Sequence, residues 1–270
     1  MIDRGMFYDR VLPIFGKQLT AEQVEGCEAS LKEYEREPLF NLDGLAYELG
    51  TEKWETCHTM QPVRETLAKT DAAVRRILAG VWYAVPDPVT GMCYYGRGKC
   101  QLTHKYNYFM VTSKLGDRFK IDFVKDPDAA LRMDAATVII MRGMNEGWFA
   151  GNGKRMADFF VDGKAPGYVA ARSLINGTAR AADIAQIALQ FRYALGGSKA
   201  ARILHLGMMN DPDVARVQKA LMTLGYDLGD GKDDGDFGPT TKRAVQAFQK
   251  RFGLDPDGVA GPQTQTALKL

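Results

Sequence analysis

The chain has 270 residues, of which 46% are hydrophobic and 25% are charged, and its formal net charge is +2. This length is enough for one large domain, or for a medium domain and a small one. So small a charge excess gives no reason to expect nucleic acid as a partner. No apolar run reaches the roughly 18 residues of a transmembrane helix, so we expect a globular protein that does not insert into a membrane.

The first ten residues carry acidic side chains where a signal peptide has its apolar core, so we expect synthesis in the cytoplasm without a signal peptide. The four cysteines show no C-x-x-C spacing, and in a cytoplasmic product we expect reduced thiols. The three histidines show none of the spacings of a zinc site, so we expect no metal and no cofactor. The same lack of pattern argues against a zinc amidase and against a Cys–His peptidase.

Helical patterns dominate the first 200 residues or so. Residues 20–23 fit a capping box in which Thr20 is the N-cap and Gln23 reaches back. Apolar residues follow at helical spacing until Pro38 ends the pattern. Three more helices are predicted, over residues 45–59, 129–147 and 181–195.

Turn signals divide these helices and mark the end of the first domain. Residues 86–91 predict a loop, and residues 94–98 after it predict a short β-hairpin region. The Gly-Gly-Ser sequence at 196–198 predicts a break. We therefore expect a large domain over residues 1–197, followed by a linker over residues 198–211.

The last 60 residues or so contain an internal repeat. Residues 234–241 and residues 257–264 both read D-G-x-x-G-P-x-T, which combines turn chemistry with the start of a helix. We expect residues 212–270 to form a small domain of three helices. Its apolar stripes are Val214, Val217, Leu221 and Leu224, then Val245, Phe248 and Phe252, and finally Ala267, Leu268 and Leu270.

Two segments of the large domain combine the groups that cleavage of a glycosidic bond needs. Residues 54–65 contain Glu55 and Glu65, and residues 94–108 contain a glycine-rich turn with neutral polar side chains. One carboxylic acid protonates the leaving oxygen, and a second carboxylate activates water or attacks directly. Glycines let the backbone approach a ligand closely. The two segments together predict a glycosidase site.

These segments resemble the catalytic domain of glycoside hydrolase family 19, which has the chitinase-like fold, and in particular its phage endolysin branch. One position departs from the family, which usually has His before the first Glu where this chain has Trp54. The similar tracts follow the family's order: E-T at 55–56, M-Q-P-V-R-E at 60–65, Y-G-R-G at 95–98, Q-L-T at 101–103, N-Y at 107–108 and I-N-G at 175–177. Nearly all of residues 212–270 resembles the small peptidoglycan-binding domain of many cell-wall hydrolases.

The resemblance implies a mainly α fold. It comprises a lysozyme- or chitinase-like helical catalytic domain with a short β-hairpin region, and a three-helix peptidoglycan-binding domain. It implies Glu55 as the general acid, Glu65 as the base of an inverting mechanism and Thr103 as the hydroxyl that orients water. The implied substrate contacts are Gln101, Asn107, Asn176, Tyr95 and Arg97. For the three amides the alternative is a structural role, and for Tyr95 and Arg97 the alternative is that they shape the site.

The expected function is that of an endolysin that hydrolyses β-1,4 bonds in the glycan strands of peptidoglycan, and both alternating bonds of the strand fit this interpretation. We expect a monomer that the C-terminal domain tethers to the wall, which it reaches in the periplasm after holin-type release. Two alternatives remain open. One is a chitinase acting on chitin, and the other is a cell-wall-binding protein without catalysis.

Overall fold

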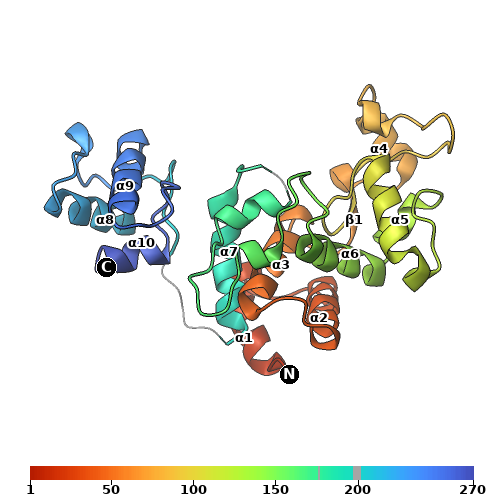
Figure 1. Cartoon of the computed structure of the whole chain (residues 1–270), viewed down its shortest axis with the longest axis horizontal. Coiled ribbons are helices and arrows are strands. Elements are labelled where there is room, and N and C mark those ends of the chain that lie inside the picture. Colours follow the sequence, from red (N-terminus) through yellow and green to blue (C-terminus); the bar gives the residue numbers. More distant parts are fainter. Residues whose placement is uncertain (176, 197–201) are drawn as a thin grey trace.

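The computed structural model describes residues 1–175, 177–196 and 202–270, and it confirms the prediction of a mainly α-helical chain (Figure 1). The α-helices are α1 (Arg4–Phe15), α2 (Ala21–Arg36), α3 (Leu42–Glu55), α4 (Asp71–Ile77), α5 (Lys105–Phe119), α6 (Met133–Glu146), α7 (Ala181–Ala194), α8 (Pro212–Thr223), α9 (Pro239–Arg251) and α10 (Pro262–Ala267). Short 3-10 helices are η1 (Glu65–Leu67), η2 (Trp82–Ala84), η3 (Pro127–Leu131), η4 (Met156–Asp158), η5 (Ala170–Leu174) and η6 (Gly229–Gly231).

The predicted helices of the large domain are present, with shifted ends. The capping box of α2 is confirmed, because the Thr20 side chain accepts from the Gln23 N–H and the Gln23 side chain accepts from the Thr20 N–H. The helix expected over 45–59 begins earlier, at an Asn41 N-cap, and stops at Glu55. It stops there because Cys57 and His58 adopt positive φ, which an α-helix cannot continue. The helix expected over 129–147 is divided into η3 and α6.

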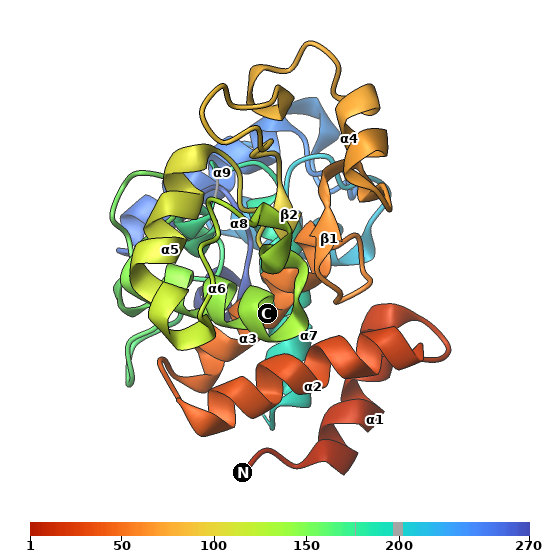
Figure 2. The ribbon, with the colours of Figure 1, turned by 90° about the vertical axis from the view of Figure 1, so that its right-hand side faces the viewer.

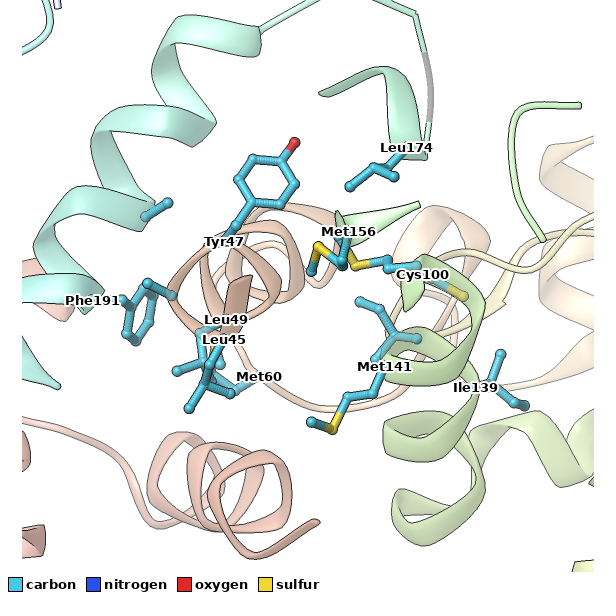
Figure 3. Packing of buried hydrophobic residues seen from close by; sticks show 14 of the residues in the cluster. Leu45, Tyr47, Leu49, Met60, Cys100, Ile139, Met141, Met156, Leu174 and Phe191 are labelled. Atoms are coloured by element: carbon cyan, nitrogen blue, oxygen red, sulfur yellow. The ribbon is translucent and has the colours of Figure 1, made fainter. Parts of the chain in front are cut away.

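Helix α3 is the central element of the large domain. Its residues from Gly44 to Lys53 are all buried, and α7, α2 and α6 pack around it. A methyl group at Gly50 would lie 3.0 Å from the backbone nitrogen of Ala188, so α3 and α7 approach closely. Figure 3 shows side chains of α3 in one core with Phe191 from α7 and with residues of α6. Burial of this apolar surface is the main stabilisation of the domain.

The N-terminal helix of the chain is part of this large domain. Helix α1 packs along α7, and Arg10 Nη1 donates to the carbonyl of Tyr193 at 3.0 Å. Figure 2 shows α1 and α2 on one side of the large domain, with α4 and its loops at the opposite end. The four cysteines are all free thiols, and Cys57 is the exposed one.

The segment predicted as a hairpin region contains one of the two strands of a very small sheet. Strand β1 (Val63–Arg64) pairs antiparallel with β2 (Arg97–Gly98), with Val63 opposite Gly98 and Arg64 opposite Arg97. Residues 65–96 between the strands carry η1, α4 and η2 and have a small apolar cluster of their own: Val74, Ala84, Cys93 and Tyr95.

The C-terminal repeat forms a domain with a separate core, built on the buried faces of α8 and α9. Leu224 and Phe252 are 45% and 50% exposed, so the predicted stripes are one residue too long at their C-terminal ends. Two residues within the predicted linker are buried in the structure. Leu204 pairs with Ala260 in a β-bridge and is fully buried in this core, whereas Ile203 belongs to the core of the large domain.

One glutamine closes each copy of the repeat. The Gln218 amide nitrogen donates to Asp234, to a backbone carbonyl and to Thr241, while its oxygen accepts from the Gly235 N–H. Gln249 makes the same four bonds, which join it to the corresponding groups of the second copy: Asp257, Val259, Thr264 and Gly258. Each loop therefore folds around the helix that precedes it.

Candidate active site

Glu55 lies at the last position of α3, with its side chain mostly buried. Arg172 of η5 donates from Nη1 to Glu55 Oε1 at 2.8 Å and from Nε to the carbonyl of Ala179 at 3.2 Å. The Cys100 thiol lies close enough to be influenced by this carboxylate. Burial, and next the charge of Glu55, raise the pKa of Cys100 to about 12. The end of α3 is adjacent to the segment that follows β2, because Glu52 Oε1 lies 2.5 Å from Lys99 Nζ.

Glu65 follows β1 directly and is held by the chain segment opposite. Its backbone N–H donates to the carbonyl of Gly96 at 2.7 Å, and its Oε2 accepts from the Gly96 N–H at 2.8 Å. Its Oε1 accepts from the Tyr83 hydroxyl at 2.9 Å. Burial, with the bond to Glu65, raises the pKa of Tyr83 above its usual value, so the phenol keeps its proton and remains the donor.

Three predicted site residues converge on Gly96. A methyl group at Gly96 would lie 2.7 Å from Gln101 Oε1 and 3.3 Å from both Glu65 Oε2 and Thr103 Oγ1. The absence of a side chain at this position therefore makes room for these groups. The Thr103 hydroxyl donates to the carbonyl of Gln101 at 2.8 Å, so its oxygen remains able to accept a hydrogen bond from a water molecule.

The predicted amides also have structural partners. Gln101 Nε2 donates to the carbonyls of Val63 and Gly98, which secures the two strands. Asn107 Nδ2 donates to the carbonyl of Thr103 at 2.7 Å and so closes the first turn of α5. Asn176 lies outside the described residues.

Tyr95 and Arg97 support the site from inside the protein. They are 0% and 2% exposed, and the Arg97 guanidinium lies 3.7 Å from the centre of the Tyr95 ring. Arg97 Nε donates to Asp128 at 2.7 Å, and the Tyr95 hydroxyl donates to Asp71 at 2.9 Å. Because neither side chain reaches the surface, we assign them to shaping the hairpin and not to contact with substrate.

Three features of this site are not apparent from the sequence. Arg172 and Tyr83 hold the two glutamates, and neither stands in a tract that marks such a role. The third feature is aromatic: Trp82 is 74% exposed and stacks on the His104 ring, with 4.9 Å between ring centres and 8° between planes. Tryptophan is enriched at contact surfaces because its ring combines a large apolar area with a polar N–H group. In the sequence, the available signal for this aromatic pair was that Trp82 adjoins Tyr83 and His104 adjoins Thr103.

Within the described residues, no group of three or more His, Cys, Asp or Glu side chains could hold a metal ion. In the same residues, no helix is both long and apolar enough to cross a membrane.

Residues 210–268 match the model of a family described as a putative peptidoglycan binding domain. The chain is 37% identical over 60 residues to a probable N-acetylmuramoyl-L-alanine amidase of Bacillus licheniformis, which covers 22% of the chain and 17% of that protein. It is 32% identical over 124 residues to chitinase 11 of Oryza sativa subsp. japonica, which covers 36% of the chain and 46% of that protein. The chain thus spans less than half of the length of either relative.

Among solved structures, chitinase C from Streptomyces griseus HUT6037 is similar to this chain with a TM-score of 0.44 and 18% identity. That similarity covers 73% of this chain and 94% of the chitinase chain.

The first prediction concerns Gly96. Gly96→Ala places a methyl group against Gln101 Oε1 and is expected to lower the free energy of unfolding by about 1–3 kcal/mol, as overpacking does. Denaturant unfolding measures this change. Gly5→Ala is the matched control, because its methyl group would meet only Asp3 Oδ1 at 3.4 Å and alanine favours a helix. Equal stability of the two variants would show that Gly96 is not a site of close packing.

Proposed function

We propose that this chain is a cell-wall hydrolase that cleaves β-1,4 glycosidic bonds in peptidoglycan. The observation that carries the proposal is the convergence of Glu65, Gln101 and Thr103 on Gly96. Glu55 lies at the end of α3, which the ion pair between Glu52 and Lys99 joins to the same segment. Two carboxylates with a hydroxyl able to bind water are the groups that glycoside hydrolysis requires. The match of residues 210–268 to a peptidoglycan-binding family supports this polymer as the substrate.

In the proposed mechanism, Glu55 is the general acid and protonates the leaving oxygen. Arg172 orients its carboxyl group through Oε1. Glu65 is the base, and its orientation is set by the Tyr83 hydroxyl and the Gly96 N–H. It removes a proton from a water molecule that Thr103 orients, so the reaction inverts the anomeric centre. Trp82 offers an exposed aromatic face to a neighbouring sugar.

The second prediction tests the acid. Glu55→Gln keeps the shape of the side chain but cannot donate a proton, so we expect release of reducing ends from purified walls to fall about 100-fold or more. Glu146→Gln is the matched control, because Glu146 ends α6, has ion-pair partners in Arg142 and Lys114, and should keep wild-type activity. More than about a tenth of the activity in Glu55→Gln would overturn the assignment.

The same digests show which glycosidic bond is cleaved and whether the anomeric configuration is inverted. Mass spectrometry of the released fragments shows which sugar carries the new reducing end. NMR of the first product formed shows whether its anomeric configuration is inverted. A retained configuration would make Glu65 a nucleophile and not a base.

The third prediction concerns tethering. The two parts have separate cores, so a chain ending at Ile203 is expected to stay folded and to cleave soluble glycan fragments at the wild-type rate. On whole walls it should be slower, because the tether that raises its local concentration is lost. Rates on the two substrates, measured side by side, check this. Equal loss of activity on both substrates would contradict it.

The matching C-terminal fragment, residues 204–270, should sediment with purified peptidoglycan. From Pro212 onward this part has 8 basic and 8 acidic residues, so its binding should weaken only modestly with salt. Complete release at moderate salt would mean that charge, and not a shaped surface, binds the wall.

The fourth prediction concerns the biological role, for which we propose a phage-type endolysin released through a holin-type pore. Expressed in a bacterial cytoplasm, the chain should lyse cells when a membrane pore is opened and leave them intact otherwise. Following culture turbidity with and without the pore tests this role. Lysis without a pore would contradict it.

A second candidate is a chitinase, which the similarity to chitinase 11 over 124 residues favours. Hydrolysis of chitin oligomers and of peptidoglycan by the same preparation compares the two candidates. The chain is a chitinase if it cleaves the chitin oligomers alone.

A further inference from the structure

A charged cluster is completely buried in the large domain, between α2, α3 and the segment after β2. It consists of Glu48 and Glu52 from α3 and Lys99 from the segment after β2, and all three are 0% exposed. We call it the Lys99 cluster. Lys99 Nζ lies 2.5 Å from Glu52 Oε1, and the Ser30 hydroxyl donates to Glu52 Oε2 at 2.7 Å. Buried charges are costly, so such a cluster persists only when its charges are compensated.

The Lys99 cluster joins the two segments that carry the candidate catalytic groups. Glu52 lies three residues before Glu55 on the same buried helix, and Lys99 lies two residues before Gln101 and four before Thr103. Lys99 Nζ also donates to the carbonyl of Gly26 in α2 at 3.1 Å, so it contacts two helices. Displacing Lys99 would therefore move Thr103 relative to Glu55.

The cluster has two carboxyl groups for one ammonium group. The titratable groups that face Glu48 are Glu52 on its own helix, Lys99 after β2 and Cys27 on α2. Burial, and next the negative charge of Glu52, raise the pKa of Glu48 well above its ordinary value. Burial also raises the pKa of the Cys27 thiol, which therefore stays neutral. A proton on Glu48 then balances the cluster: one ammonium, one carboxylate and one neutral acid.

We propose that Lys99 and Glu52 are positioning residues that set the spacing between α3 and the Gln101–Thr103 segment, and that Glu48 keeps their cluster neutral by holding a proton. The catalytic consequence rests on the proposed function, whereas the structural role does not. Ionisation of Glu48 gives the buried cluster a net negative charge and loosens the segment after β2.

The direction of the pH effect follows from linkage. A glutamic acid whose pKa is higher in the folded state than in the unfolded state contributes to the stability of the fold. This contribution is complete when the pH is below the unfolded pKa, which is about 4.3 for Glu. That contribution is lost as the pH rises towards and through the raised folded pKa. Loosening is therefore expected as the pH rises above the ordinary range of a glutamic acid, and Glu48→Gln, which cannot ionise, should abolish it.

The fifth prediction is read from amide hydrogen exchange of residues 97–103 in the full chain, corrected for the intrinsic rate at each pH. Between pH 6 and pH 9, wild-type protection should fall tenfold or more, while protection in Glu48→Gln should stay within twofold. Glu146→Gln is the control and should behave as wild type. The proposal is overturned if wild-type protection is unchanged, or if Glu48→Gln loses it to the same extent.

Activity provides the second measurement. Lys99→Met leaves Glu52 buried and unpaired and is expected to unfold at a much lower temperature. The double variant Lys99→Met/Glu52→Leu removes both charges and should fold. On soluble glycan fragments its kcat should fall about tenfold or more with KM unchanged, because small displacements of catalytic groups are costly. A kcat within twofold of wild type would show that the cluster does not position the site.

The two measurements separate the proposals. If the wild-type chain cleaves no glycan, the proposed function fails, and hydrogen exchange alone then decides whether the Lys99 cluster holds the segment after β2.

Discussion

The close packing of α3 against α7 is the constraint on which the rest of the large domain depends. Gly50 favours this packing, because a methyl group there would lie only 3.0 Å from the backbone nitrogen of Ala188. With α3 enclosed on all sides, its last residue, Glu55, has a defined position although it stands at a helix end. The short helix η5, which precedes α7 in the chain, brings Arg172 to the same carboxylate. Packing in the core thus determines geometry at the surface.

The half of the site that carries Glu65 and Thr103 has almost no regular structure to hold it. Its sheet has two residues in each strand, so the backbone ladder contributes little. Side chains replace the ladder. Arg97 anchors the segment to Asp128 on one side, and Lys99 anchors it to Glu52 on the other. Lys99 and Glu52 are both fully buried, where their pairing is screened little by salt, and losing one of them would leave an unpaired buried charge. Arg97 is buried too, but Asp128 is partly exposed and Arg97 has a second partner in Asp71.

Local signals in the sequence predicted local features well. The capping box at Thr20 depends on residues three positions apart, and each repeated turn has a bond between residues two positions apart. The structure has both as expected. Arg172 could not be found in this way, since it meets Glu55 across 117 residues of chain. The burial of Leu204, which lies within the predicted linker, could not be found locally either, because it gains its partner, Ala260, only in the folded domain. Burial of Tyr95 and Arg97 likewise depends on packing that a motif does not encode.

The contact between α1 and α7 has a consequence for how the protein folds. Arg10 and Tyr193 are 183 residues apart, so the large domain cannot complete its core until nearly all of it has left the ribosome. The small domain is built differently, because its glutamines bond within 8 to 23 residues along the chain. Contacts of short sequence separation form fast, and distant ones form slowly. We expect the C-terminal domain to be made last and yet to fold quickly, while the large domain in front of it is still completing its core.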